Sequence, residues 1–154
     1  MLARVSDQDR DPLLHTVLGG YMLRECLGAG GSARVYRGES TTQKRIVRAI
    51  KVIHWEQTRK LGRRFIEEAR LLEELAHPNI VKFHHATEDQ GYLVMVLEML
   101  RGKTLRAQID MWRREGQQAP LAEVLDIMIQ ASEGVAFAHA FRKGVVHRDI
   151  KPEN

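Results

Sequence analysis

The sequence has only one cysteine, Cys26, so no disulfide can form within the chain. This usage fits a reducing compartment. Because Cys26 lies in an apolar, strand-like stretch, we expect a small core residue rather than a nucleophile. The seven histidines lack the spacing of metal ligands. These shortages argue against a disulfide-rich scaffold and against a zinc protein.

Long apolar runs are also lacking. The run Leu93–Leu97 ends at Glu98 and is far shorter than a membrane span. Residues 1–16 are polar and acidic, unlike a secretory signal peptide. We therefore expect no membrane segment in this chain and, by default, a cytoplasmic location.

No strong excess of one charge is present. The chain carries 24 Lys and Arg against 20 Asp and Glu, a formal net charge of +4, and the basic residues are scattered in pairs. No basic run is interleaved with stacking aromatic residues, so we expect no nucleic-acid partner. With 44% hydrophobic and 29% charged residues, the composition is that of an ordinary globular protein.

The first hundred residues are dominated by strand patterns. Residues 1–18 are expected to be a flexible lead-in. A strand, rather than a helix, follows the glycine cluster near residue 30, which disfavours a dinucleotide-binding fold. Alternation and β-branched residues predict these strands: Tyr21–Leu27, Ala33–Arg37, Ile46–Ile53, Ile80–His85 and Tyr92–Leu97.

Helical patterns lie within and after this region. Residues 58–76 carry an apolar stripe at helical spacing. Thr104 is a candidate N-cap for a helix over Leu105–Glu115, and Leu121–Lys143 is a long apolar helix. The order predicts an α+β lobe followed by a helical one.

A glycine-rich turn, Gly28-Ala29-Gly30-Gly31, joins the first two predicted strands. Glycines there let the backbone approach a bulky anion, so that N–H groups can face phosphate oxygens. An ordinary hairpin turn explains the same pattern equally well.

Lys51 and Glu68 form the second candidate constellation. Strand alternation places Val47, Ala49 and Lys51 on one face, which suggests an anion facing the ammonium group. Glu68 falls on the apolar stripe of the helix, where a carboxylate is costly unless a cation meets it. Lys51 is the natural partner, although a lysine at a strand edge and a glutamate at the wet margin of the stripe remain the alternative.

The most specific motif is the last one, His147-Arg148-Asp149-Ile150-Lys151-Pro152-Glu153-Asn154. A carboxylate, an ammonium group two residues later and an amide five residues later could accept a hydroxyl proton, steady a phosphoryl group and hold a metal ion. A chance match after the preceding features, in the same order, is negligible.

Together these features resemble the signature set of protein kinases, from about Gly20 to the last residue. The resemblance implies a protein kinase-like fold with a complete five-stranded N-lobe and one helix, then the first helices and catalytic loop of the C-lobe. Residues 19–100 would be the ATP-binding lobe and hinge, and residues 101–154 the start of the second lobe. The glycine loop and Gly19-Gly20-Tyr21 resemble bacterial members.

The resemblance further implies ATP and Mg²⁺ as cofactors and assigns the nucleotide contacts. Gly28, Gly30 and Gly31 would cover the phosphates, and Val35 and Ala49 would lie against the adenine.

Further contacts with the nucleotide follow from the same resemblance. Lys51 would contact the α- and β-phosphates and pair with Glu68. Leu97 would be the gatekeeper, while the Glu98 carbonyl and the Leu100 amide would hydrogen-bond the adenine edge.

For the chemistry, Asp149 would be the catalytic base, Lys151 would neutralise the γ-phosphate and Asn154 would bind Mg²⁺. Lysine two places after the aspartate is the pattern of Ser/Thr-directed kinases, so the implied reaction transfers the γ-phosphate of ATP to Ser or Thr hydroxyls of a protein substrate.

Some positions depart from the family pattern. Ala33 replaces the third loop glycine, Arg48 occupies a position that is usually small and apolar, and Phe141 replaces a common histidine. All three are compatible with the fold, since alanine is small and Arg48 faces away from Lys51.

The chain ends five residues after Asp149, before any Asp-Phe-Gly and activation segments. We therefore expect weak or no kinase activity from the chain alone. One hypothesis is a partial sequence of an active kinase. The alternative is a truncated pseudokinase, a non-catalytic nucleotide-binding or protein-interaction module with a protein partner on the exposed helix 121–143.

Overall fold

The computed structural model describes residues 11–30, 33–54, 59–141, 147 and 149–153. The chain folds into two compact units. The first comprises Met1–Glu74 and Val81–Leu100, and the second comprises Leu75–Ile80 and Arg101–Asn154. The division after Leu100 lies where the sequence predicted the first lobe to end, whereas Leu75–Ile80 belongs to the second unit.

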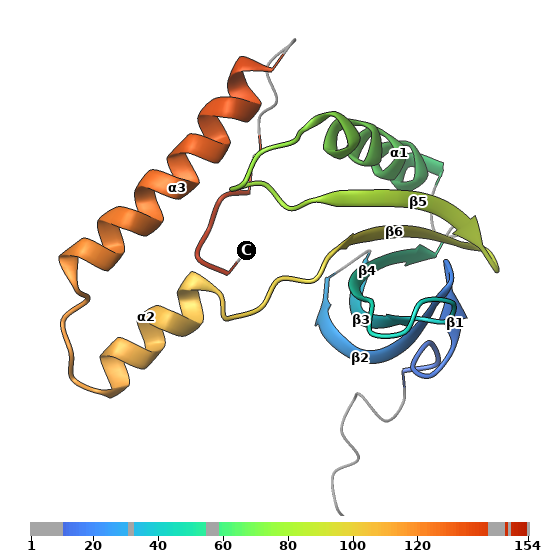
Figure 1. Ribbon diagram of the computed structural model, residues 1–154, viewed down its shortest axis with the longest axis horizontal. Helices are drawn as coiled ribbons and strands as arrows, with labels where there is room; N and C mark the ends of the chain where they lie inside the picture. Colours follow the sequence, from blue (N-terminus) through green and yellow to red (C-terminus); the bar gives the residue numbers. More distant parts are fainter. Residues whose placement is uncertain (1–10, 31–32, 55–58, 142–146, 148, 154) are drawn as a thin grey trace, which may run out of the picture. The chain divides into compact units, whose positions relative to one another are not determined.

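In the first unit, the residues that the structure describes form one antiparallel sheet and one helix (Figure 1). Within the described residues the sheet has six strands in the order β1-β2-β3-β4-β6-β5, so β5 is an edge strand. The helix α1, Arg59–Glu74, contacts β5 and β6. The strands are β1 Val17–Leu18, β2 Tyr21–Ala29, β3 Arg34–Ser40, β4 Val47–His54, β5 Phe83–Asp89 and β6 Tyr92–Glu98.

Two tight glycine turns set the register of this sheet. Gly19 and Gly20, both with positive φ, join β1 to β2, and Gln90 and Gly91, again both with positive φ, join β5 to β6. Positive φ at both central residues suits a two-residue hairpin turn. The strand predicted over Ile80–His85 is shifted in the structure, because β5 begins at Phe83 and continues through Glu88 and Asp89. Charged residues are well tolerated on an edge strand.

The flexible lead-in expected over residues 1–18 is wrong for residues 11–18, while residues 1–10 lie outside the described part of the chain. Residues 11–18 are packed on the sheet, and Val17–Leu18 forms the strand β1, which the sequence analysis missed. Leu18 is fully buried, while Leu13 and Leu14 are partly buried against the same core. The sheet therefore has one strand more than predicted.

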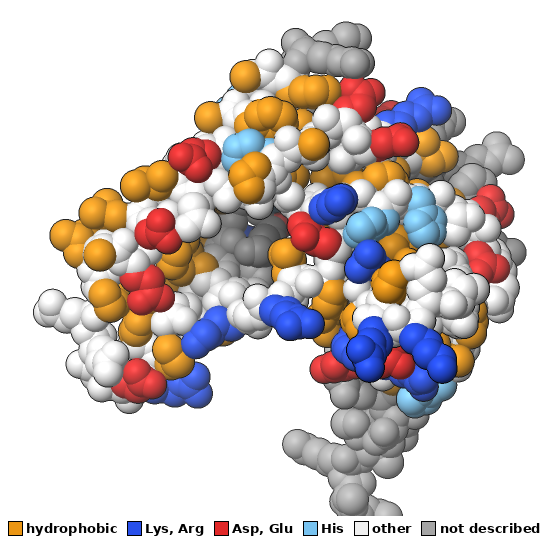
Figure 2. Space-filling view, viewed as in Figure 1, with side chains coloured by type: hydrophobic (Ala, Val, Ile, Leu, Met, Phe, Trp, Pro, Cys, Tyr) orange, Lys and Arg blue, Asp and Glu red, His pale blue; other side chains and the backbone are white. Residues whose placement is uncertain are grey.

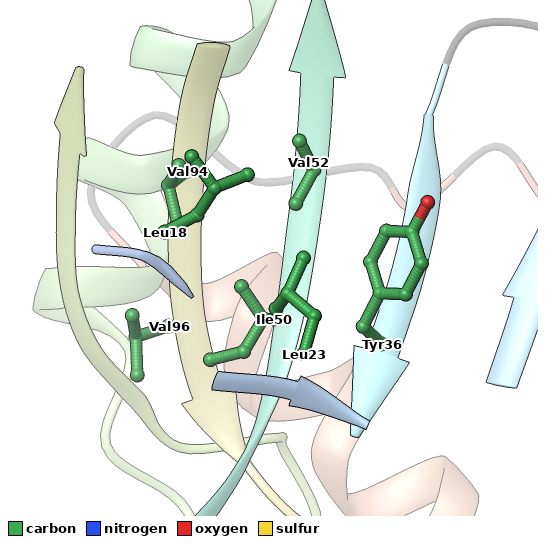
Figure 3. Packing of buried hydrophobic residues seen from close by; sticks show 7 residues of the cluster. All are labelled: Leu18, Leu23, Tyr36, Ile50, Val52, Val94 and Val96. Atoms are coloured by element: carbon green, nitrogen blue, oxygen red, sulfur yellow. The ribbon is translucent and has the colours of Figure 1, made fainter. Parts of the chain in front are cut away.

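The sheet separates two clusters of buried side chains. Even-numbered residues of β4 and β6 point to one face, which carries the cluster in Figure 3: Leu18, Leu23, Tyr36, Ile50, Val52, Val94 and Val96. Odd-numbered residues point to the opposite face, where Leu93 and Met95 pack against Phe65 and Ala69 of α1. This period-two alternation decides which side chains face α1.

A close approach at Gly38 gives a stability prediction. A Cβ atom at this position would lie 2.5 Å from Cγ1 of Ile50 and 3.0 Å from Cβ of Tyr21. We expect Gly38→Ala to lower the free energy of unfolding by about 1–3 kcal/mol, measured by urea denaturation, because the surrounding core must shift. Gly28→Ala is the control, since a Cβ there meets no atom within 4 Å; equal losses in the two variants would contradict the packing argument.

The described residues of the second unit form two helices, α2 Leu105–Arg114 and α3 Leu121–Ala140 (Figure 1). The predicted cap is confirmed, because the Thr104 side chain accepts a hydrogen bond of 3.2 Å from the Ala107 N–H. Gly116, with positive φ, follows the end of α2. The helix α3 ends earlier than predicted, with Phe141 already extended.

One face of α3 packs against residues 75–80. A Cβ at Gly134 would lie only 2.9 Å from the Asn79 carbonyl oxygen, and Asn79 donates a 3.1 Å hydrogen bond to Glu133. The rest of α3 is largely exposed, including Leu121, Leu125, Met128 and Ile129. Figure 2 shows hydrophobic side chains at the surface over this helix. No helix in the described part of the chain is both long and apolar enough to span a membrane.

Candidate active site

The glycine-rich segment forms the end of a β-hairpin. Gly28 pairs with Val35 across β2 and β3, and the Gly30 N–H donates a 2.8 Å hydrogen bond to the Ala33 carbonyl. Gly28 and Gly30 are exposed, and no atom would meet a Cβ built on Gly28. The hairpin backbone is thus accessible to a bulky ligand such as a phosphate chain. Gly31 lies outside the described residues.

Lys51 lies on the α1 face of β4, as its alternation predicted. Its two strand neighbours, Ile50 and Val52, are buried on the opposite face. The Lys51 Nζ is 2.6 Å from Oε1 and 2.8 Å from Oε2 of Glu68. The predicted meeting of strand ammonium and helix carboxylate is therefore confirmed, with both carboxylate oxygens accepting.

The packing of α1 explains how Glu68 reaches Lys51. Phe65 and Ala69, which flank Glu68 on the helix, are buried against Leu93 and Met95 of β6. The position of Glu68 on the apolar stripe suggested a carboxylate directed at the core, but its side chain is 45% exposed. The Lys51 side chain is 22% exposed. The pair lies at the wet margin of the apolar stripe, where an ion pair contributes little to the stability of the fold.

The two residues predicted to lie against the adenine, Val35 and Ala49, and the predicted gatekeeper Leu97 share the face of Lys51. Ala49 pairs with Leu97 across β4 and β6, and Val35 pairs with Lys51 across β3 and β4. Directly paired residues of antiparallel strands point to the same side. Val35, Ala49 and Leu97 are each half-buried, so they form an apolar floor beside the ammonium group.

The predicted hinge begins at the end of β6. The Glu98 N–H donates a 2.9 Å hydrogen bond to the Lys82 carbonyl, and the Glu98 side chain accepts a 2.7 Å bond from the Lys82 N–H. This reciprocal pair fixes the start of the hinge to the segment before β5. Leu100 is 66% exposed.

In the second unit, Asp149 and Lys151 lie side by side. The Lys151 Nζ is 3.0 Å from Oδ1 and 2.9 Å from Oδ2 of Asp149, and both side chains are about half exposed. The Asp149 N–H donates to Nδ1 of His147 at 3.3 Å. The structure thus brings together two of the three predicted residues of this loop; Asn154 lies outside the described residues.

Sequence reasoning missed Arg106, which holds the end of this loop on α2. Its backbone N–H donates a 2.7 Å hydrogen bond to the Pro152 carbonyl, and its Nε lies 2.9 Å from Oε1 of Glu153. A free N–H in the first turn of a helix needs such an acceptor. The only signal in the sequence is the capped helix start at Thr104.

A groove of about 470 Å³ lies between α1 and β5 and does not coincide with the candidate residues. Phe65, Ala69, Phe83 and Leu93 contribute to its lining, but Lys51, Glu68 and the glycines do not. Burial, together with nearby Arg48 and Lys82, lowers the pKa of His84 in this groove. Among the described residues, no group of three or more His, Cys, Asp or Glu side chains could hold a metal ion.

A glycine hairpin, a strand lysine paired to a helix glutamate and an aspartate–lysine loop define a protein kinase. Residues 21–154 match the family model of the protein kinase domain, so the chain belongs to that family. It is 35% identical over 136 residues to the serine/threonine-protein kinase PkaB of Streptomyces coelicolor, covering 87% of this chain and 30% of PkaB.

Other kinases match over similar lengths. The chain is 32% identical over 153 residues to the tyrosine-protein kinase MasK of Myxococcus xanthus, covering 93% of this chain and 24% of MasK. A crystal structure of the Mycobacterium tuberculosis PknI kinase domain superposes with a TM-score of 0.70 at 26% identity, covering 91% of this chain and 55% of that chain. The chain therefore spans about a third or less of these curated relatives and about half of that kinase domain.

Proposed function

We propose that this chain is the ATP-binding and catalytic-loop part of a serine/threonine protein kinase. Residues 19–100 would form the nucleotide-binding lobe, and residues 101–154 would begin the lobe that carries the catalytic loop. The observation that carries the proposal is the bidentate contact between Lys51 and Glu68, on the same sheet face as Val35 and Ala49.

The residues of the first unit fit a nucleotide. Lys51 would bind the α- and β-phosphates while Glu68 holds its side chain in place. Gly28, Gly30 and Gly31 would cover the phosphates with backbone N–H groups. The apolar floor of Val35, Ala49 and Leu97 suits a planar adenine. The Glu98 carbonyl and the Leu100 N–H would form hydrogen bonds with the polar edge of the adenine.

Magnesium would be held largely by the nucleotide itself. Mg²⁺ commonly binds one or two protein oxygen ligands together with substrate phosphates and water. Asn154 would supply one protein ligand. The shortage of clustered acidic side chains among the described residues agrees with such a shared site.

Asp149 and Lys151 would act on the transferred group. Bound MgATP supplies the γ-phosphoryl group. The Asp149 carboxylate would accept the proton of the substrate hydroxyl, and Lys151, which lies against that carboxylate, would neutralise charge on the phosphoryl oxygens. Arg106 would keep the loop in register by binding Pro152 and Glu153.

Serine and threonine are the proposed acceptors in a protein substrate. Support comes from Lys151 and from relatives such as PkaB, which is named a serine/threonine-protein kinase. The test is phosphotransfer from labelled ATP to a mixed protein substrate by the complete gene product, followed by phosphoamino-acid analysis. We expect phosphoserine and phosphothreonine. Phosphotyrosine, as the name of MasK would suggest, contradicts the specificity. Nucleotide binding without phosphotransfer favours the pseudokinase alternative.

The ion pair gives a further prediction. We expect Glu68→Gln to lower phosphotransfer about tenfold or more, because an amide no longer holds the Lys51 ammonium by charge. The free energy of unfolding should change by less than about 1 kcal/mol, since the pair is partly exposed. Glu67→Gln, at the exposed position next to Glu68 and outside the apolar stripe, is the matched control. Equal activity in the two variants would refute the assigned role of Glu68.

A further inference from the structure

A buried carboxylate lies at the beginning of the described chain. The Asp11 side chain is only 4% exposed. Its Oδ1 accepts a 3.1 Å hydrogen bond from the Leu13 N–H, and its Oδ2 accepts a 2.8 Å bond from the Tyr36 hydroxyl and lies 2.8 Å from NH1 of Arg34. Among the described residues, the polar contacts of this group come from its own segment and from β3.

The two partners on β3 flank a candidate nucleotide contact. Arg34 and Tyr36 are the neighbours of Val35 and point to the sheet face opposite the one that Val35 shares with Lys51. Arg34 also pairs with Ala29, so it stands at the base of the glycine hairpin. Asp11 therefore contacts the side chains of both neighbours of Val35, on the opposite face of the sheet.

The segment that carries Asp11 is itself fixed. Leu18 is buried in the cluster of Figure 3, and the backbone of Leu23 in β2 accepts from His15 N–H and donates to the Thr16 carbonyl. In Figure 3 the Tyr36 hydroxyl points away from Ile50 and Leu23. This hydroxyl donates its hydrogen bond to Asp11. The Asp11 carboxylate thus belongs to a segment that is packed and hydrogen-bonded to the sheet, so it can restrain the hairpin.

We propose that Asp11 is a positioning residue that sets the nucleotide-binding hairpin by clamping Arg34 and Tyr36. The inference rests on the proposed function of the hairpin. It assigns to residues 11–18 a part in nucleotide affinity and not only in stability, because each β3 residue beside Val35 is tied to the same carboxylate. Loss of the clamp leaves the hairpin free to sample geometries that do not match the phosphates.

The charges at the clamp support this arrangement. Burial raises the pKa of Asp11, but the hydrogen bonds from Leu13 and Tyr36 and the guanidinium of Arg34 outweigh it and hold the pKa below its usual range. Burial and the bond to Asp11 raise the pKa of Tyr36, so its hydroxyl remains a donor. The clamp is therefore formed at neutral pH.

The experiment compares Asp11→Ala, Arg34→Gln and the control Glu39→Gln in the complete gene product. Glu39 is also on β3 and pairs with Arg24 and Arg37, but it lies at the far end of the strand from the hairpin. We expect Asp11→Ala to raise KM for ATP about tenfold with kcat changed less than about twofold, and Arg34→Gln, at a half-exposed position, to shift KM in the same direction by a smaller factor.

Hydrogen exchange gives a second readout that needs no nucleotide. We expect the Gly30 amide, which bonds to Ala33, to exchange about tenfold faster in Asp11→Ala, while amides of β6 are unchanged. If Asp11 had only a structural role, its loss would lower the fraction of active protein and hence the apparent kcat. KM for ATP and the exchange rate of the Gly30 amide would then stay unaltered, and that result would overturn the proposal. If wild-type protein binds no ATP, the proposed function fails too; if it binds and both variants match Glu39→Gln, the inference alone fails.

Discussion

Lys51→Met is expected to abolish ATP-dependent phosphorylation, with a loss of at least about a hundredfold. The substitution keeps a side chain of similar length but removes the ammonium group that meets both Glu68 oxygens at 2.6 and 2.8 Å. Loss of one preorganised electrostatic element at a reacting centre costs about 10²–10³ in rate. The measurement is phosphotransfer from labelled ATP together with a nucleotide titration of the same preparation.

Lys82→Met is the matched control for this result. Lys82 is an exposed lysine of the same unit, and the hydrogen bonds that tie it to Glu98 use its backbone. The control should retain activity within about twofold, as expected for a surface substitution. Activity of Lys51→Met close to that of the control would mean that the nucleotide site is misassigned.

Asp149→Asn should separate chemistry from binding. The amide preserves the size of the side chain but can no longer accept the substrate proton, and removal of a general base costs about 10²–10⁴ in rate. Because no adenine or phosphate contact is assigned to Asp149, ATP affinity should stay within about threefold. Single-turnover phosphotransfer and nucleotide titration report the two quantities independently.

Asp126→Asn on α3 controls for the loss of one exposed carboxylate in the same unit. Asp126 accepts a 2.7 Å hydrogen bond from Gln130 and has no assigned catalytic role. It should be as active as the wild-type protein. If Asp149→Asn retained full phosphotransfer, another group would have to accept the proton.

The sequence predicted those parts of the site that depend on local periodicity. Alternation alone placed Lys51 and Ala49 on one face of β4, and helical spacing brought Glu68 to the same side as Phe65. The glycine turn and the cap at Thr104 are likewise local signals, read from a few adjacent residues.

Features that depend on long-range contacts were missed. The burial of Asp11 depends on Tyr36, 25 residues further along the chain. In the sequence Arg106 looks like any other arginine. Its role depends on contacts with Pro152 and Glu153, which form only in the folded chain. The stripe position of Glu68 suggested a buried carboxylate, but burial is set by the neighbours of α1, which leave this side chain 45% exposed.

The most direct test of the nucleotide site is covalent labelling with an acyl-phosphate derivative of ATP. The Nζ of a lysine beside the bound phosphates attacks the acyl carbonyl, forms an amide and releases the nucleotide. Peptide mass spectrometry should find the label on Lys51, and excess ATP with Mg²⁺ should prevent it. Labelling that ATP does not block, or that falls only on lysines other than Lys51 and Lys151, would contradict the account.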